Sequence, residues 1–315
     1  MPAEQARYYD YATFLRQYFE GKVQKISVDA GFTCPNRDGL ISHGGCTFCN
    51  NHTFNPEYCR KESSITQQLQ EGIRFFRRKY PSMQYLAYFQ AYTNTYAPLD
   101  VLAARYEEAL SVPGVVGIII GPRPDCMPSE LLQYLSQLAR HTFVTVEYGV
   151  ESTCDRTLQR INRGHDFATA AHTIRRTAEA GIITGAHLIL GLPGESRTDM
   201  LMHAQRLSQL PLHTIKLHQL QLIKGTAMGH EYTEHPEHFN IPDIDTYIDL
   251  AIDFTQHLTP HIAIERFASQ SPASLLIAPR WGIKNYELTA RIIRRMKQRN
   301  AWQGQLYDRQ AQPEI

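Results

Sequence analysis

The sequence has no run of about 18 apolar residues, and this absence excludes an ordinary membrane-spanning helix. Residues 1–7 are not followed by an apolar segment of the secretory type. Only six of 315 residues are cysteine, which does not suit a secreted disulfide framework. The net charge of +1 gives no global electrostatic signature for nucleic acid or a membrane surface. We therefore expect a cytoplasmic protein that keeps its thiols reduced and has no membrane partner.

The cysteines that are present gather in one loop, residues 31–51, which is rich in glycine and asparagine. Three of them lie there, with eleven residues between the first two and two between the last two: Cys34, Cys46 and Cys49. Thiolates at this density select zinc or an iron–sulfur cluster. Zinc would need a fourth ligand, for which the nearby candidates are His43, His52 and Cys59. A cluster held by three cysteines would leave one iron open, and the thiols alone do not separate the two alternatives.

Apolar strands and helical segments alternate along most of the chain, which is typical of a parallel α/β sheet covered on its faces. The expected strands are residues 25–29, 85–90, 115–120, 143–148, 183–190 and 214–222. Helices are expected at 8–20, 64–79, 99–110, 129–140, 166–180, 197–209, 244–257 and 286–299, with a loop at 228–243 and another strand at 262–267. Six βα units are too few for a full eight-stranded barrel, and a doubly wound sheet remains an alternative.

Polar residues and Gly-Pro turns follow several of the expected strands. They include Gln90 and Asn94, the stretch 121–126, Glu147 inside an apolar strand, and the turn 191–195. Ligands bind at the carboxyl ends of strands in parallel α/β folds, and the cysteine loop follows such an end as well. We therefore expect these residues to converge on one face of the molecule.

Several motifs resemble those of the radical S-adenosyl-L-methionine (SAM) superfamily. They are Cys46-Thr-Phe-Cys49, Thr33-Cys-Pro-Asn-Arg-Asp-Gly39, Tyr88-Phe-Gln-Ala-Tyr92, Arg123-Pro-Asp-Cys126, Asn162-Arg-Gly-His-Asp166, His187-Leu-Ile-Leu-Gly-Leu-Pro-Gly-Glu195 and Ile215-Lys-Leu-His218. Together they are most similar to the YhcC-like radical SAM proteins, over residues 8–282. The gap of eleven residues departs from the common three-residue spacing and resembles that of the Elongator catalytic subunit.

This resemblance implies an α/β fold with a partial, open (β/α)6 TIM-type barrel. It implies an N-terminal helical extension at 1–24, the radical SAM core barrel at 25–226 and a C-terminal α/β extension at 227–315. Cys34, Cys46 and Cys49 would hold a 4Fe–4S cluster that binds SAM and cleaves it to a 5′-deoxyadenosyl radical. A low-potential electron donor such as flavodoxin or ferredoxin would be the redox partner.

The resemblance also assigns roles to residues outside the cysteine motif. Phe48 and Gly191 would lie by the adenine, Glu147 would bind the ribose, and Arg163 or Arg123 would bind the methionine carboxylate. Gln90 and Asn94 stand where the superfamily often has a Gly-Gly-Glu motif for the methionine amino group, which this sequence lacks. Cys126 is a candidate hydrogen donor or substrate contact. Each has a structural alternative: turn capping for Gln90 and Asn94, an ion pair for Glu147, and apolar packing for Cys126.

The substrate is the least determined part of the prediction. Resemblance to the Elongator subgroup favours a tRNA nucleoside, and the basic stretches 74–79 and 291–299 are candidate phosphate contacts. Acetyl transfer is not expected, because no acetyl-CoA-binding glycine motif is found near residue 315. The alternatives are a small metabolite or peptide substrate, a zinc-stabilised nucleic-acid-binding module without catalysis, and an electron-transfer protein with a closed cluster.

Overall fold

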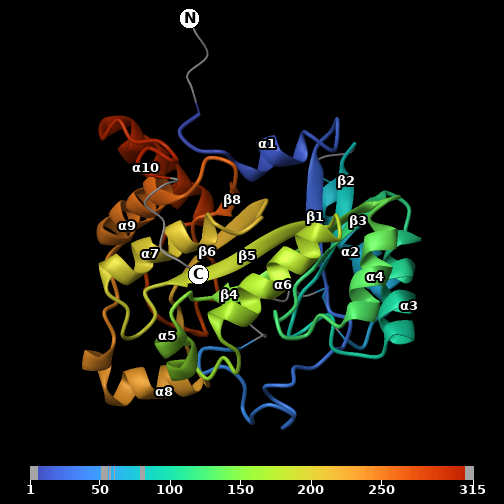
Figure 1. Ribbon diagram of the computed structural model, residues 1–315, viewed down its shortest axis with the longest axis horizontal. Coiled ribbons are helices and arrows are strands. Elements are labelled where there is room, and N and C mark those ends of the chain that lie inside the picture. Colours follow the sequence, from blue (N-terminus) through green and yellow to red (C-terminus); the bar gives the residue numbers. More distant parts are fainter. Residues whose placement is uncertain (1–5, 51–55, 57, 60, 79–81, 309–315) are drawn as a thin grey trace, which may run out of the picture.

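The structure, a computed structural model, describes residues 6–50, 56, 58–59, 61–78 and 82–308. Seven parallel strands form one curled sheet in the order β1-β2-β3-β4-β5-β6-β8 (Figure 1). Their bounds are β1 Val23–Val28, β2 Gln84–Phe89, β3 Val115–Ile120, β4 Phe143–Glu151, β5 Ile183–Leu190, β6 Thr214–Gln219 and β8 Ala263–Arg266. Two short strands, β7 Leu222–Ile223 and β9 Leu276–Ala278, pair antiparallel beside the sheet.

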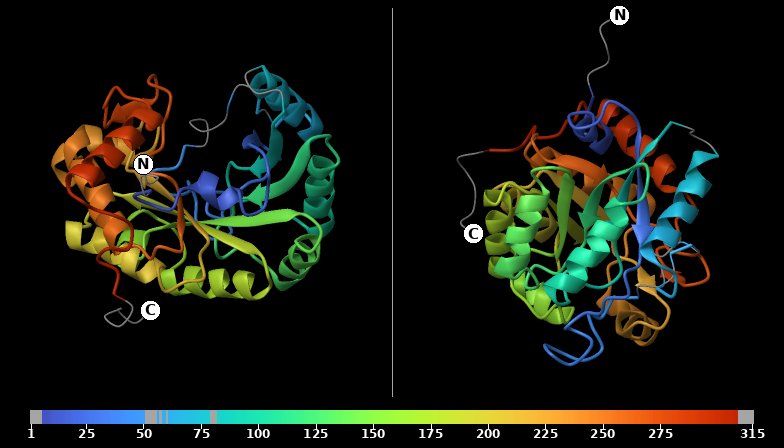
Figure 2. Two further views of the ribbon diagram at one scale, coloured as in Figure 1. Left: turned by 90° about the horizontal axis from the view of Figure 1, so that it is seen from above. Right: turned by 90° about the vertical axis from the view of Figure 1, so that its right-hand side faces the viewer.

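Helices cover the convex face of the sheet, so that the molecule has the shape of a half barrel (Figure 2). Between the strands run α2 Ile65–Arg77, α3 Leu99–Leu110, α4 Ser129–Leu138, α5 Asp155–Arg160, α6 Phe167–Glu179, α7 Arg197–Leu207, α8 Ala227–Glu234 and α9 Ile244–His257, and the last helix is α10 Asn285–Gln298. Side chains that cap the first turn mark several helix starts, among them Ser64, Asp166 and Ser196.

Alternation along the strands separates the two faces of the sheet. On β4, Val144, Val146 and Tyr148 belong to the main hydrophobic core, and the Tyr148 hydroxyl lies 2.7 Å from Thr177 Oγ1 on α6. The intervening Glu147 and Gly149 line the concave interior. Because side chains alternate with a period of two, one strand supplies both the core and the interior.

The short helix α1, Tyr11–Leu15, closes one end of the concave interior. Its Phe14 and Leu15 are buried in a second hydrophobic cluster with residues of the inner sheet face: Leu86, Tyr88, Ile119, Phe143 and Ala263. The predicted helix at 8–20 is therefore too long, and within the predicted N-terminal extension Phe14 and Leu15 pack against the inner face of the sheet. A backbone bridge between Asp10 and Ile264 also ties this segment to β8.

One further prediction, for the last third of the chain, is wrong. The expected loop at 228–243 contains α8, which Thr226 caps, and a 3-10 turn at Pro236–His238. The strand assigned to a C-terminal extension, β8, pairs with β6 and continues the sheet to seven strands. The sheet thus continues past residue 226, where the sequence suggested a boundary between the core barrel and a C-terminal extension. No helix within the described ranges is long and apolar enough to cross a membrane.

Candidate functional site

A cavity of about 680 Å³ occupies the concave side of the sheet. It runs from the cysteine loop, past the carboxyl half of the strands, to Tyr11 of α1, and is lined by side chains from β1, β2, β4, β5, β6 and β8. Small-molecule sites occupy roughly 300–1,000 Å³, so this cavity suits a cofactor together with part of a substrate. Of the residues expected to converge here, the cysteines, Gln90, residues 121–123 and Glu147 line the cavity, whereas Asn94, Cys126 and the turn 191–195 do not.

All three predicted cysteine ligands line this cavity: Cys34, Cys46 and Cys49. Asn36 Nδ2 and Arg163 NH1 lie 3.6 Å and 3.5 Å from the Cys46 sulfur, so both direct N–H groups at it. Burial and the neighbouring thiols raise the pKa of Cys49 to about 12, so a bound cation would be needed to keep this sulfur ionised near neutral pH. The donor set therefore fits an iron–sulfur cluster, whose thiolates accept such hydrogen bonds.

The arrangement does not fit a tetrahedral zinc site. A zinc ion bound at about 2.3 Å would bring its sulfurs within roughly 4 Å of one another. The three cysteine sulfurs do not all lie within 4.8 Å of one another. Among the described residues, the group whose three possible metal-ligand atoms meet this distance is the exposed trio His235, Glu237 and His238. His43 is exposed and neither it nor Cys59 lines the cavity, and His52 lies outside the described residues.

The turn at Asn162-Arg163 is packed on the cysteine loop. Asn36 donates to the Asn162 carbonyl at 2.6 Å, and Asn162 donates back to the Gly45 carbonyl at 2.9 Å. The Arg163 guanidinium reaches from this turn to Cys46, and it also donates to the carbonyl of Gly149 on β4. Arg163 is thus held between the cysteines and the interior, where the predicted methionine carboxylate would lie.

The two arginines predicted as carboxylate ligands differ in how far their charge is neutralised. Arg123 makes two hydrogen bonds with Asp125, at 2.9 Å and 2.7 Å, in a bidentate pair. Arg163 has its nearest carboxylate, Glu151, at 3.9 Å, and its Nε is buried without a hydrogen-bond partner. Both line the cavity, but Arg163 retains more capacity for an anion.

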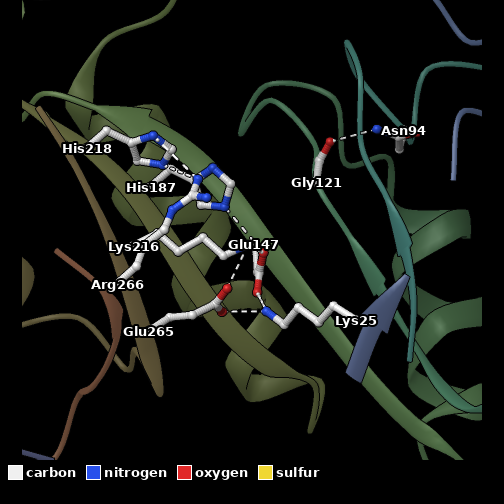
Figure 3. A network of polar contacts seen from close by, with 9 residues as sticks. All are labelled: Lys25, Asn94, Gly121, Glu147, His187, Lys216, His218, Glu265 and Arg266. Atoms are coloured by element: carbon white, nitrogen blue, oxygen red, sulfur yellow. Dashed lines mark hydrogen bonds and ion pairs between the residues drawn. The ribbon is translucent and has the colours of Figure 1, made fainter. Parts of the chain in front are cut away.

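Glu147, predicted to bind ribose, instead lies at the centre of an ion-pair group (Figure 3). Lys25 from β1 contacts it at 2.8 Å, Lys216 from β6 pairs with it, and His187 from β5 lies at 3.3 Å. Glu265 of β8 pairs with both lysines, and we call Lys25, Glu147, Lys216 and Glu265 the interior quartet. Only 1% of the Glu147 side chain is exposed, so ribose hydroxyls would have to displace existing partners. The ion-pair alternative is the one that the geometry favours.

Burial and the neighbouring charges shift the pKa values of Glu147, Lys216 and His187. Although burial opposes ionisation, Lys216 and Lys25 hold the pKa of Glu147 well below its usual range. Burial lowers the pKa of Lys216 to about 8, against the attraction of Glu147 and Glu265. Burial together with Lys216 lowers the pKa of His187 to about 4, so this imidazole is neutral near pH 7.

Glu151 is an acidic residue of the site to which the sequence reasoning assigned no role. It lines the cavity at the end of β4, with 13% of its side chain exposed, and burial raises its pKa. Its φ of +67° is unusual for a residue with a Cβ, and such backbone strain gathers at functional sites. The signal in the sequence was the period of two, which places Glu147, Gly149 and Glu151 on one face of β4. Glu151 is therefore a second candidate for the ribose or amino group of SAM.

The remaining predicted contacts separate into those that reach the cavity and those that do not. Phe48 and Gln90 line it, and Ala91 and Tyr92 beside Gln90 have φ values of +74° and +58°. Asn94 is 1% exposed and donates to the carbonyls of Ala91 and Gly121, which is a turn-capping role (Figure 3). Asn94 does not line the cavity, and its predicted role at the methionine amino group loses support.

Cys126 and Gly191 also do not line the cavity. The Cys126 side chain is buried, its sulfur lies 3.8 Å from Asp125 Oδ1, and burial raises the pKa of its thiol to about 12. This environment suits a packing residue rather than a hydrogen donor to a substrate. Gly191 has a φ of +93°, so a plain turn requirement explains this glycine.

Comparisons with known protein families agree with this geometry. The family model described as Radical SAM superfamily matches residues 34–207, and that of the Radical_SAM C-terminal domain matches residues 212–298. The first range contains all three cysteines, and together the two ranges contain β2 to β8 and every cavity-lining residue from Glu147 to Arg266.

Similar proteins span nearly the whole chain. Protein YtqA of Bacillus subtilis is 35% identical over 303 residues, covering 96% of this chain and 94% of YtqA. Protein YhcC of Escherichia coli is 37% identical over 268 residues, covering 85% of each. Among solved structures, archaeal Elp3 of Methanocaldococcus infernus with an N-terminal deletion superposes with a TM-score of 0.68 at 15% identity, covering 93% of this chain and 69% of Elp3.

Proposed function

Because the chain belongs to the radical SAM superfamily, we propose that it modifies a nucleoside of tRNA by hydrogen abstraction from the substrate inside the half barrel. The protein is a radical SAM enzyme that uses a 4Fe–4S cluster and SAM. Cys34, Cys46 and Cys49 would hold the cluster, which would supply the electron for reductive cleavage of SAM. The interpretations as a zinc-stabilised binding module or an electron carrier are wrong, since family membership identifies an enzyme.

The observation that supports this proposal is the shared cavity. The cysteines lie at one end, the polar interior lies beyond them, and α1 closes the opposite end. This chain's residues would hold SAM between Arg163, Phe48 and Glu151, while the enclosed walls exclude water from a radical. Since α1 blocks one end, a substrate would have to enter from the side of the cysteine loop or the open edge.

Support for tRNA as the substrate comes from relatives. Over 191 residues the chain is 25% identical to a tRNA uridine(34) acetyltransferase of Dehalococcoides mccartyi, covering 56% of this chain and 39% of that protein. A base that undergoes chemistry must leave its stack, and an open half barrel offers a lateral mouth for it. A small metabolite or peptide would fit the same cavity, and remains the second candidate.

The structure revises the surface on which RNA would bind. On α10, Arg295 and Arg299 form ion pairs with acidic residues of α9: Asp245, Asp249 and Asp253. Their charge is thus partly neutralised within the protein. Arg291 and Arg294 are exposed on the same helix, and Arg74, Arg77 and Arg78 are exposed at the end of α2. The two basic helices lie toward opposite edges of the curled sheet, on either side of α1 (Figure 2).

The test compares modified nucleosides in tRNA from a deletion strain and its parent, with the wild-type gene restored as a control. Loss of one nucleoside and accumulation of its precursor is the expected result. Purified protein should also bind total tRNA more weakly as salt rises. Changing Arg291 and Arg294 to Glu should lower the slope of log affinity against log salt by about 2. The exposed Arg140, changed to Glu, is the control. Identical nucleoside profiles would favour the small-molecule candidate.

A further inference from the structure

Arg266, on β8, carries the positive charge that the interior of the half barrel leaves unbalanced. The two lysines of the interior quartet are matched by its two glutamates. Arg266 lines the same cavity, but no carboxylate of the described residues lies within ion-pair distance of it. Arg266 is partly buried, and a cation without an anionic partner in a partly desolvated space favours a bound anion.

The hydrogen bonds of Arg266 also leave donors available. Within the described residues, its hydrogen-bond partner is the His218 ring, whose Nε2 lies 3.0 Å from the guanidinium, and its Nε is buried without a partner. Burial and Arg266 itself hold the pKa of His218 well below its usual range, so this ring is neutral and accepts the hydrogen bond. A guanidinium has five N–H donors, so most of them remain for a ligand.

The position of Arg266 points it at the reacting region rather than at the surface. The register places Arg266 beside Lys216, Lys216 beside His187, and His187 beside Gly149. The Gly149 carbonyl is the group to which Arg163 donates, and Arg163 also contacts Cys46. Figure 3 shows the Arg266 guanidinium among the side chains of His187, His218 and Lys216. A group bound to Arg266 would thus lie across the cavity from the cysteine end.

We propose that Arg266 and His218 form an anion site inside the half barrel, which binds a carboxylate of the substrate. A carboxylate matches a planar guanidinium in geometry and brings one negative charge against one unbalanced positive charge. A phosphate monoester would bring up to two charges into a space that already holds Glu147 and Glu265, which disfavours it. This inference rests on the proposed function in one respect, that the substrate enters the interior of the half barrel.

The test measures binding of propionate, propionamide and inorganic phosphate to the anaerobic, cluster-loaded enzyme by ligand-observed NMR. Propionate should bind and the other two should not. Arg266→Gln should weaken propionate binding by about tenfold or more, since a hydrogen-bonded ion pair is lost. Arg280→Gln, at an exposed arginine whose hydrogen bond is to the Leu276 carbonyl, should leave propionate binding unchanged. Iron content and circular dichroism should be the same in all three proteins.

Three results would overturn the proposal. Equal propionate affinity in wild type and Arg266→Gln would show that the arginine is not the anion ligand. Tighter binding of phosphate than of propionate would assign the site to a phosphate group. Displacement of propionate by SAM would assign Arg266 to the cofactor's own carboxylate, which we place at Arg163 instead. Should the variant lose iron, Arg266→Lys provides the same comparison with the charge kept and the planar fork removed.

The source of the carboxylate is decided by the nucleoside that accumulates in the deletion strain. Acidic methanol converts a carboxylic acid to its methyl ester with loss of water, so a precursor nucleoside carrying one should gain the mass of one CH2 unit. An accumulating nucleoside without a carboxylate would overturn the inference while the proposed function stands. If no nucleoside changes but propionate binding still depends on Arg266, the proposed RNA substrate fails and the carboxylate belongs to a small metabolite.

Discussion

Replacing Glu147 by Gln tests whether the interior quartet or the cofactor determines what this residue does. The carboxylate contacts Lys25 at 2.8 Å, pairs with Lys216 and lies 3.3 Å from His187, and only 1% of its side chain is exposed. Glutamine keeps the shape but removes the charge, so Lys216 loses its main partner. Removing one partner of a buried ion pair destabilises a protein by about 3–5 kcal/mol. We expect a loss of this size in the free energy of unfolding near neutral pH.

The same replacement should also change how the free energy of unfolding depends on pH. Burial lowers the pKa of Lys216 to about 8 from a usual 10.5, so folding releases a proton between these values and stability rises with pH there. Glu147 raises the pKa of Lys216, and its replacement moves that pKa below 8. In Glu147→Gln, the pH range over which the free energy of unfolding rises therefore begins at a lower pH than in wild type. The difference in unfolding free energy between the two proteins should become smaller as pH rises toward 8. In the wild type, the contribution of Glu147 is lost only as pH falls through its own pKa, which lies well below 4.5.

The assay is reversible denaturant unfolding of anaerobic protein, followed by circular dichroism, with SAM affinity measured by equilibrium dialysis. The double variant Glu147→Gln with Lys216→Met also removes the ammonium group that lost its main partner, while Lys25 keeps its ion pair with Glu265. This double variant should recover more than half of the unfolding free energy that Glu147→Gln loses. The exposed Glu71 on α2, changed to Gln, is the matched control. If Glu147→Gln unfolds like wild type and only its SAM affinity falls, the reasoning is refuted and the ribose role is correct.

Four other substitutions test the remaining parts of the site. Cys46→Ala should abolish the cluster, measured as iron and sulfide per chain under anaerobic conditions, and normal iron content would disprove the ligand assignment. Arg163→Ala should weaken SAM binding about tenfold or more while iron is retained, because a charge-assisted pair is lost. Arg123→Ala should weaken SAM binding less, since Asp125 already neutralises the Arg123 guanidinium. Cys126→Ala should keep SAM cleavage and nucleoside modification within about twofold of wild type, since packing changes without a cavity contact cost little; loss of modification with SAM cleavage intact would restore its role as a hydrogen donor.

The sequence alone predicted much of the fold, because period and composition are local properties. The β3 strand at 115–120 and the helices at 99–110 and 244–257 have the predicted bounds, since long apolar or amphipathic runs are bounded there by clear turn signals. The cysteine loop could also be recognised in the sequence, because its three thiols fall within sixteen residues, and their role as ligands stays a prediction. The motifs around them identified the superfamily, which the comparisons confirm.

The tertiary structure decided which interior side chains meet. Lys25 and Glu147 are 122 residues apart, and Glu147 and Lys216 are 69 apart, so no local pattern couples them. The period of two indicated only that Glu147 faces one side of its strand. Its partners depend on the strand order and on the curl of the sheet, which carries β1, β4, β6 and β8 around a common interior. The same curl brought Arg266, from a segment predicted to lie outside the barrel, into the cavity.

Tertiary contacts likewise decided how the charges and thiols beyond the cysteine loop are used. The basic run 291–299 indicated a surface for phosphates, but α9 packs against α10 and its aspartates pair with Arg295 and Arg299. Cys126 follows a strand end near the site, yet it does not line the cavity, and its sulfur lies 3.8 Å from Asp125 Oδ1. A sequence records which groups are present at each strand end. The path of the backbone between strands determines which of those groups face the interior, and that path depends on contacts between distant segments.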